Sequence, residues 1–238
     1  MKVKKLVLPS IIIIVLFAGL FLLSNRSTNP SKKAVSSRAT SFDKMQYSID
    51  APGSIWWIVN KKRTLPDGYV PQNLSVPKVQ LRLDTTAEQM KIRSDITAPV
   101  EAMFTAAREK NISLLFASGY RSESYQRQLY NSYVAKDGQA AADRYSAKPG
   151  TSEHQTGLAF DVCEAGTNCD LEISFGATKA GKWIAQNASK FGFIVRYQKG
   201  KESITGYQYE PWHLRYVGTS LASELQKKNQ TMEEMFGL

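Results

Sequence analysis

The chain of 238 residues carries a net charge of +10 at pH 7 and contains only two histidines and two cysteines. We find no internal repeat. The charge alone would suit a nucleic-acid-binding protein, but the N-terminal segment is typical of export, and export excludes nucleic acid as a partner. Two explanations of the charge stay open: attraction to anionic cell-wall polymers or lipid head groups, and an ordinary solvated basic surface.

The first 23 residues predict a membrane segment. Lys2, Lys4 and Lys5 precede residues 6–23, which carry no charge and approach the length of a membrane span. Basic residues before a span keep the N-terminus inside, so the remainder is exported. No A-x-A cleavage site follows the apolar run, and no cysteine is present there for lipidation. We therefore expect an uncleaved signal-anchor, with a removed signal peptide as the alternative.

A linker and one domain follow this segment. Residues 24–40 are rich in Ser, Asn, Lys and Arg, which predicts a flexible tether. Residues 41–238 fit one domain of ordinary size. We expect this domain to lie outside the cell membrane of a Gram-positive bacterium, because a single anchored domain facing the wall suits that envelope.

The domain mixes helical and extended patterns. Apolar residues at three- and four-residue spacing predict helices, and short apolar runs predict strands. In chain order we first expect a strand at 55–59 and a helix from Pro99 to about Asn111 that buries Val100, Met103, Phe104 and Ala107. A strand at 112–117 then leads to a helix whose Tyr125, Leu129, Tyr130 and Tyr133 face the core. The remaining elements are a strand at 158–162, a helix at 177–190 stopped by Gly192, a hairpin of 193–197 with 207–216, and a last helix capped by Thr231 and Glu234. The fold class is α+β, with a small antiparallel sheet flanked by helices.

Cys163 and Cys169 are predicted to form a disulfide. Gly166 and Asn168 between them favour a turn, and an exported domain meets an oxidising environment. Closing this short loop contributes about 2 kcal/mol on the chain-entropy model. A metal site is the weaker alternative, because neither cysteine belongs to a C-x₂-C pair.

Both histidines lie in motifs typical of metal sites. His154 belongs to Ser-Glu-His-Gln-Thr-Gly-Leu-Ala-Phe-Asp, which ends at Asp161, and His213 belongs to Glu-Pro-Trp-His, which begins at Glu210. Imidazole and carboxylate suit Zn²⁺, and three protein ligands leave a fourth position for water. We therefore expect His154, Asp161 and His213 to bind zinc in a metallo-hydrolase.

Two further residues would complete the chemistry. Glu210, as a carboxylate that does not bind the metal, would accept the proton of the attacking water. Arg121, between a strand and a helix, would stabilise the developing oxyanion. In an extended chain Glu210 and His213 would point to opposite faces, so we expect a local turn at Pro211 to bring both to one metal.

Each of these residues also has a plain structural explanation. A histidine is more often a hydrogen-bonded structural residue than a ligand. Glu210 could be a surface carboxylate, and Arg121 could pair with Glu123. The occurrence of both histidines beside acidic residues favours the zinc site over these alternatives.

Three motifs, in this order, resemble those of the VanY-type D-alanyl-D-alanine carboxypeptidases and their L,D-carboxypeptidase relatives. They are Ser118-Gly-Tyr-Arg-Ser, Ser152-x-His-x-x-Gly-x-Ala-x-Asp161 and Glu210-x-Trp-His213. The resemblance covers about residues 56–238 and implies the zinc-peptidase fold shared with VanX-type dipeptidases and hedgehog. It implies these roles: zinc ligands His154, Asp161 and His213; catalytic base Glu210; transition-state stabiliser Arg121; substrate-carboxylate contacts Gln126 and Ser152; further substrate contacts Ser118, Tyr120 and Trp212.

The sequence thus predicts a zinc D,D-carboxypeptidase that removes the C-terminal D-alanine from peptidoglycan stem peptides by attack of zinc-bound water. Two alternatives stay open. One is an L,D-carboxypeptidase acting on tetrapeptide stems. The other is a non-catalytic zinc-containing wall-binding module, although the presence of Glu210 and Arg121 speaks against it. A serine acyl-enzyme is excluded, because no Ser-x-x-Lys begins a credible helix.

Overall fold

Four antiparallel strands form the central sheet, and the computed structural model describes residues 43–238 of the chain. The strand order is β3-β4-β6-β5, and all three pairings are antiparallel. The strands are β3 (Leu114–Ser118), β4 (Ala159–Glu164), β5 (Phe193–Tyr197) and β6 (Glu210–Tyr216). The predicted α+β class with a small antiparallel sheet is confirmed.

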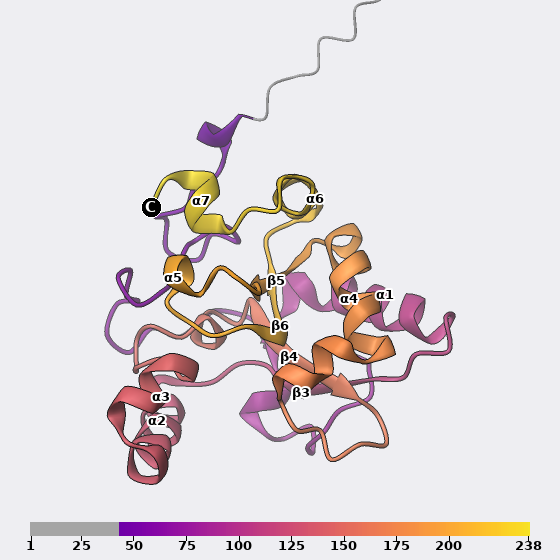
Figure 1. Cartoon of the computed structure of the whole chain (residues 1–238), viewed down its shortest axis with the longest axis horizontal. Coiled ribbons are helices and arrows are strands. Elements are labelled where there is room, and N and C mark those ends of the chain that lie inside the picture. Colours follow the sequence, from indigo (N-terminus) through magenta and orange to yellow (C-terminus); the bar gives the residue numbers. More distant parts are fainter. Residues whose placement is uncertain (1–42) are drawn as a thin grey trace, which may run out of the picture. The chain divides into compact units, whose positions relative to one another are not determined.

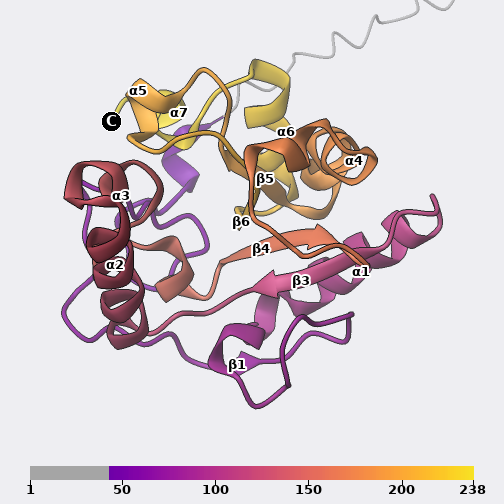
Figure 2. The same ribbon diagram turned by 60° about the horizontal axis from the view of Figure 1, so that its bottom comes forward.

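Helices lie around this sheet (Figure 1). Within residues 43–238 the α-helices are α1 (Thr97–Arg108), α2 (Glu123–Asp137), α3 (Gln139–Tyr145), α4 (Lys179–Asn187), α5 (Glu202–Thr205), α6 (Thr219–Lys228) and α7 (Met232–Phe236). The 3-10 helices are η1 (Lys44–Gln46), η2 (Glu88–Met90), η3 (Ser94–Ile96), η4 (Glu153–Thr156), η5 (Ile173–Ala177) and η6 (Ala188–Phe191). A separate small sheet pairs β1 (Leu74–Ser75) with β2 (Ile92–Arg93). In Figures 1 and 2, α2 and α3 lie together on one side of the strands, and α1 and α4 lie on the opposite side.

Side chains alternate between the two faces of the sheet. One face is apolar and packs with residues of α1 and α4 in the main hydrophobic core; its strand residues include Leu114, Phe116, Phe160, Val162, Phe193 and Leu214. The intervening residues point the other way, and they include the buried polar side chains Asp161, Arg196, His213 and Arg215. Neighbouring residues of one strand therefore point alternately into the hydrophobic core and to the polar face that carries the candidate site.

The helix predicted from Pro99 onward is confirmed as α1. Its buried residues are the four expected ones, Val100, Met103, Phe104 and Ala107. The helix ends at Arg108, slightly before the predicted end, and the chain then turns through Asn111 with a positive φ of 56°. The strand and helix predictions from residue 112 to residue 216 are likewise met by β3, α2, β4, α4, β5 and β6.

The apolar run at 55–59 is not a strand, contrary to the prediction. Ile55 is partly exposed, whereas Ile58 is fully buried, and the backbone between them is irregular. The carbonyl oxygens of Ile55 and Trp57 accept hydrogen bonds from the Arg215 guanidinium at 3.1 and 2.8 Å. A side chain thus satisfies carbonyl groups that a neighbouring strand would otherwise have to satisfy.

The tyrosine face of α2 is largely outside the core, which is a second error of the sequence analysis. Tyr130 is buried, but Tyr125 is 36% exposed. The helix packs against α3, where the rings of Tyr133 and Tyr145 lie 5.1 Å apart. The spacing of the tyrosines identified a helix correctly but not the surface that it covers.

Two local predictions are confirmed. Cys163 and Cys169 form a disulfide with a Cα–Cα distance of 5.3 Å. Thr231 and Glu234 form a capping box at the start of α7, in which each side chain accepts a hydrogen bond from the other residue's backbone N–H.

The predicted membrane segment at 1–23 and tether at 24–40 lie outside the described residues. Within residues 43–238, no helix combines the length and apolar character needed to cross a membrane. The division of the chain into these segments and a domain starting at residue 41 stays a prediction.

Candidate metal centre and active-site cavity

Three buried side chains meet on the polar face of the sheet: His154, Asp161 and His213, which we call the metal cluster. One potential ligand atom of each lies within 4.8 Å of the others. His154 belongs to η4, Asp161 to β4 and His213 to β6. Asp161 and His213 are partners in the antiparallel register, so their side chains leave the same face. The pairing of β4 with β6 therefore joins the two sequence motifs.

A backbone carbonyl fixes the ring of His154. Its Nδ1 lies 2.6 Å from the carbonyl oxygen of Gly119. Because a carbonyl only accepts, Nδ1 carries the proton and Nε2 keeps its lone pair. A Cβ at Gly119 would overlap the carbonyl oxygen of Lys91, so this close approach requires glycine. After η4, Gly157 adopts a left-handed conformation with φ 68° and turns the chain into β4.

His213 is held between two carboxylates and an aromatic ring. Its Nδ1 lies 3.1 Å from Asp161 Oδ1, and its Nε2 lies 3.5 Å from Glu153 Oε2. The ring of Tyr197 packs against the imidazole with a centroid distance of 4.9 Å. Both ring nitrogens of His213 therefore face acidic groups.

The metal cluster fits a zinc ion. Ligands at about 2.0–2.2 Å from a tetrahedral ion lie roughly 3.3–3.6 Å from one another. Asp161 Oδ2 lies 3.4 Å from His154 Nε2, and Asp161 Oδ1 lies 3.1 Å from His213 Nδ1, both close to that spacing. His154 Nε2 is buried and has no hydrogen-bond partner in the described part of the chain. An unprotonated imidazole nitrogen facing a carboxylate is the donor set that zinc prefers.

The charges of the cluster favour a bound cation. Burial, with the neighbouring Arg121, lowers the pKa of His154 to about 4, so this ring is neutral at pH 7. Burial would raise the pKa of Asp161, but the two histidines outweigh it and hold this pKa well below its usual range. For His213, burial is outweighed by Asp161 and Glu153, which raise the pKa to about 9. A metal bound here would therefore displace one of the two ring protons of the charged His213.

A bulge in β6 brings Glu210 to the metal cluster. The prediction of a turn at Pro211 is wrong, because Pro211 belongs to the strand. Val195 pairs with Leu214, whereas Tyr197 pairs with Glu210. Two steps along β5 thus correspond to four steps along β6. The extra residues of β6 form a bulge, which re-aims the side chains of an otherwise extended strand.

Glu210 is a buried carboxylate in an acidic environment. Burial raises its pKa to about 8; Asp161 and Glu153 add to this effect, while His213 and Arg121 oppose it. A carboxylate with this pKa takes up a proton more readily near neutral pH than an exposed glutamate does.

Arg121 lies between β3 and α2, as predicted. Its backbone N–H lies 3.3 Å from the carbonyl oxygen of His154, and its buried Nε has no hydrogen-bond partner among the described residues. The alternative partner Glu123 binds Arg127 instead, at 2.6 Å, and accepts the N–H of Gly68. The suggested pairing of Arg121 with Glu123 is therefore absent.

The metal cluster opens into a cavity of about 140 Å³. Most of the predicted site residues line it, namely Arg121, Gln126, Ser152, His154, Asp161, Glu210, Trp212 and His213. Ser118 and Tyr120 do not belong to this lining. Ser118 lies in β3 opposite Asp161, and the backbone N–H of Tyr120 donates to the carbonyl oxygen of Lys91.

Gln126 lies deep in the wall of the cavity. Its Nε2 donates to the carbonyl oxygen of Ala147 at 2.7 Å, and its buried Oε1 has no partner among the residues that the structure describes. A bond from Gln126 Nε2 to a substrate carboxylate would therefore share a donor group that already holds the loop after α3.

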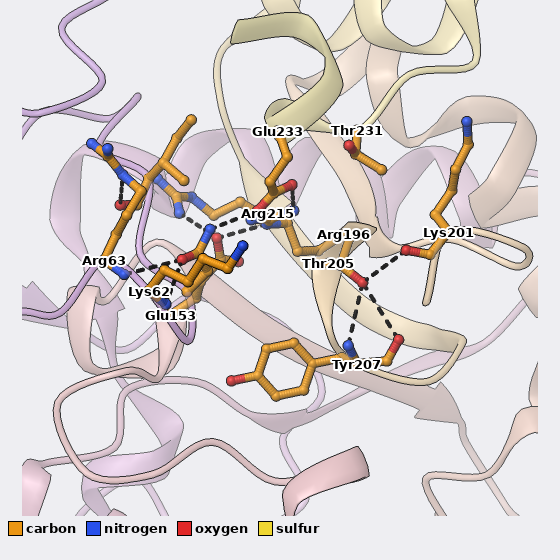
Figure 3. A network of polar contacts seen from close by, with 12 residues as sticks. Lys62, Arg63, Glu153, Arg196, Lys201, Thr205, Tyr207, Arg215, Thr231 and Glu233 are labelled. Carbon is orange, nitrogen blue, oxygen red and sulfur yellow. Dashed lines mark hydrogen bonds and ion pairs between the residues drawn. The ribbon is translucent and has the colours of Figure 1, made fainter. Parts of the chain in front are cut away.

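The sequence analysis missed a second group of charged residues behind the metal cluster. Glu153, Arg196, Arg215 and Glu233, which we call the ion network, are all buried (Figure 3). Burial would raise the pKa of Glu153, but Arg196 and Arg215 outweigh it and hold this pKa well below its usual range. The arginine within the apolar run of β5 was the signal that could have revealed the network. Further cavity residues that were missed are Tyr133, Tyr145, Tyr197, Tyr207 and Gln208.

Known proteins share this sequence and fold. The family model for VanY, D-alanyl-D-alanine carboxypeptidase, matches residues 89–219. YodJ of Bacillus subtilis is 41% identical over 189 residues, which cover 79% of this chain and 69% of YodJ. The structure of the LdcB LD-carboxypeptidase, described for peptidoglycan recognition, has a TM-score of 0.74 at 41% identity and covers 78% of this chain and 87% of LdcB.

A zinc-containing structure is also similar. The vancomycin-resistance D,D-pentapeptidase VanY, as a mutant in complex with Zn(II), has a TM-score of 0.63 at 32% identity and covers 75% of this chain and 97% of that protein. The family model spans more than half of this chain and includes the metal cluster, Glu210 and Arg121. The chain therefore belongs to the VanY family of D-alanyl-D-alanine carboxypeptidases.

Proposed function

We propose that the protein is a zinc-dependent carboxypeptidase that removes the C-terminal D-alanine from peptidoglycan stem peptides. The observation that carries this proposal is one cavity that joins the metal cluster with a buried glutamate and an arginine whose Nε lacks a partner. The relatives support it, because LdcB is described for peptidoglycan recognition and VanY was crystallised with zinc.

The metal cluster would hold zinc through His154, Asp161 and His213. A zinc ion there would polarise the scissile carbonyl and activate a water molecule for attack. Glu210 lines the same cavity and would accept the proton of that water, then give it to the leaving D-alanine amine. The burial of Glu210 supports this role, because the raised pKa of about 8 suits a group that both accepts and donates near neutral pH.

Arg121 would stabilise the oxyanion that develops on the attacked carbonyl. Its buried Nε has no acceptor within residues 43–238, so a substrate oxygen would supply the missing partner. Because this charge appears only in the transition state, the contact would raise kcat rather than strengthen substrate binding.

Ser152 and Gln126 would recognise the terminal carboxylate. Both line the cavity and are buried. A carboxypeptidase has to distinguish a free chain end from a peptide bond, and hydrogen bonds to a charged group are worth about 1.5–3 kcal/mol each. Trp212 would form part of the apolar wall beside them.

D,D-specificity is our first candidate, and an L,D-carboxypeptidase is the second. The family description supports the first, whereas the higher identity and TM-score of LdcB favour the second. The two substrates differ in stem length and in the stereochemistry of the residue before the terminal D-alanine. A pentapeptide stem ending in D-Ala-D-Ala and a tetrapeptide stem ending in L-residue-D-Ala therefore distinguish them.

We also propose that the domain acts outside the cell membrane, tethered by its N-terminal segment. The Cys163–Cys169 disulfide supports an oxidising location. Membrane fractionation of cells, with protease added from outside, tests this location.

The proposed function is tested by mass spectrometry of defined stem peptides after incubation with the protein. We expect loss of one D-alanine from the free acid and almost none from the same peptide with an amidated terminus. Equal cleavage of the amidated peptide would contradict the carboxylate contacts and indicate an endopeptidase.

A further inference from the structure

One buried carboxylate next to the metal cluster has no role in the proposed reaction. Glu153 precedes His154, and its side chain is fully buried. Its Oε1 accepts two hydrogen bonds, from Arg196 Nε at 2.8 Å and from Arg215 Nη1 at 2.7 Å. Its Oε2 has no hydrogen-bond partner within residues 43–238 and lies 3.5 Å from Nε2 of His213, which also has none there. The two unpartnered atoms therefore face each other.

The two arginines hold Glu153 rigidly from separate parts of the chain. Arg196 binds both oxygens of Glu233 in α7, at 2.8 and 2.6 Å. Arg215 donates to the carbonyl oxygens of Ile55 and Trp57. Figure 3 shows Glu153 and Glu233 with the guanidinium groups between them. Glu153 thus cannot swing away from His213 without breaking bonds that extend to the C-terminal helix.

When one ring nitrogen of His213 binds the metal, only the other nitrogen carries a proton and needs an acceptor. Nδ1 lies 3.1 Å from Asp161 Oδ1, in the metal cluster. A nitrogen that binds a metal offers its lone pair, so the ring proton then sits on Nε2. The atom that Nε2 faces is Oε2 of Glu153. A carboxylate that accepts from the second nitrogen of a histidine ligand fixes the tautomer and the orientation of the ring.

We propose that Glu153 is a positioning residue for His213: its Oε2 accepts the Nε2 proton and presents Nδ1 to the metal. Within the ion network, Arg196 and Arg215 both hold Glu153, so its position does not depend on Glu233 alone. This inference rests on the proposed zinc site. A purely structural Glu153 would need only the contacts of Oε1, and it would not place its second oxygen opposite an unpartnered imidazole nitrogen.

Zinc affinity of the full-length protein tests the inference, measured by competition with a chromogenic chelator. In Glu153→Gln the amide oxygen stays with the arginines, so its NH₂ group faces the Nε2 proton, donor against donor. We expect zinc affinity to fall by about 10–100-fold, as for other outer ligand partners. Glu233→Gln is the matched control, because it removes the same charge from Arg196 without touching His213. Its zinc affinity should stay within about threefold of the parent, while its thermal stability falls like that of Glu153→Gln.

A second measurement on the parent protein holds even if Glu153→Gln fails to fold. The chain contains only two histidines, so selective ¹⁵N-histidine labelling gives two ring systems. In the zinc-loaded protein, we expect His154 to carry its proton on Nδ1 and His213 on Nε2, the latter exchanging slowly with solvent.

Three results would overturn the inference: unchanged zinc affinity in Glu153→Gln, an equal loss in Glu233→Gln, or a His213 proton on Nδ1. In each of them the parent still binds zinc and the proposed function stands. A parent protein that binds no zinc would overturn the proposed function itself, and the inference with it.

Discussion

The polar face of the sheet carries two buried groups of charged residues, and they differ in how their polar atoms are satisfied. In the ion network, Arg196 and Arg215 are surrounded by acceptors at hydrogen-bond distance. Around the metal cluster the opposite holds. Among residues 43–238, eight buried side-chain polar atoms lack a partner, and six belong to residues that line the cavity: Arg121, Gln126, Glu153, His154, Tyr207 and His213.

The ion network therefore stabilises the fold, whereas the groups around the metal cluster await a ligand, apart from Oε2 of Glu153 and Nε2 of His213, which face each other. Buried polar atoms are normally hydrogen-bonded, so a concentration of exceptions indicates a missing partner such as a metal or substrate. One glutamate beside each region responds to pH in the opposite direction from the other, because Glu210 has a raised pKa and Glu233 a lowered one. Each of the following experiments changes one region and compares the result with the other.

The largest expected effect is that of Glu210→Gln on turnover. The amide has nearly the same shape but cannot accept the proton of water, so kcat should fall by about 10²–10⁴-fold. The variant should still bind one zinc ion, since Glu210 lies outside the metal cluster. A rate near that of the parent would make Glu210 a structural carboxylate and require another base.

Arg121→Ala should lower kcat by about 10²–10³-fold with little change in KM, because its partner charge develops only in the transition state. Steady-state kinetics on a stem peptide separates the two constants. A change confined to KM would instead place Arg121 on the ground-state substrate.

Glu233→Gln should destabilise the fold by about 3–5 kcal/mol, because it removes one of the two carboxylates that pair with the buried Arg196. The pKa of Glu233 is lowered in the folded protein, where burial is outweighed by Arg196. Its contribution is therefore present above the ordinary glutamate pKa of about 4.5 and is lost as the pH falls below it. Denaturant unfolding of both proteins between pH 7 and pH 3 should show the difference shrinking toward acid; a constant difference would rule out the ion pair as its cause.

In the metal-free protein, Glu210→Gln should give the reverse pH dependence. The folded pKa of Glu210 is raised to about 8, so ionising this buried carboxylate costs stability as the pH rises from about 4.5 to 8. Relative to the parent, the variant should thus gain stability over this range. Chelator-treated samples, unfolded thermally at pH 5 and pH 8, test this expectation, and a variant whose stability relative to the parent falls between pH 5 and pH 8 would contradict it.

Gln126→Ala should reduce kcat/KM by about 10–100-fold, through loss of one hydrogen bond to a charged group. Because Gln126 also holds the carbonyl of Ala147, the thermal stability of the variant has to be measured beside its kinetics. Equal kcat/KM for parent and variant would exclude Gln126 from substrate binding.

The smallest effect is expected from the disulfide, which lies outside both regions. Reduction of Cys163–Cys169 should cost about 2 kcal/mol and leave zinc binding intact, because the closed loop follows Asp161. Loss of zinc on mild reduction would show that the loop supports the end of β4.

The sequence predicted the local features of this protein better than its long-range ones. The period of α1, the capping box at Thr231 and the disulfide depend on neighbouring residues, and all three are present. The motifs also placed both histidines near Asp161 correctly. These features need only a few positions of the chain.

The errors arose where distant segments meet. The carbonyl groups of Ile55 and Trp57 are satisfied by Arg215, a side chain about 160 positions away, rather than by a partner strand. Glu210 reaches the cavity through a mismatch between two strands, which neither strand reveals alone. The ion network likewise joins four separate segments, and only the unexpected arginine in β5 hinted at it.

Zinc content measured together with turnover tests the central claim most directly. The purified protein should contain about one zinc ion per chain, lose D-alanine release when a chelator removes the metal, and regain it with one equivalent of Zn²⁺. His213→Ala should show neither the metal nor the activity. Full release of D-alanine from a stem peptide by protein that holds no divalent metal would contradict the claim.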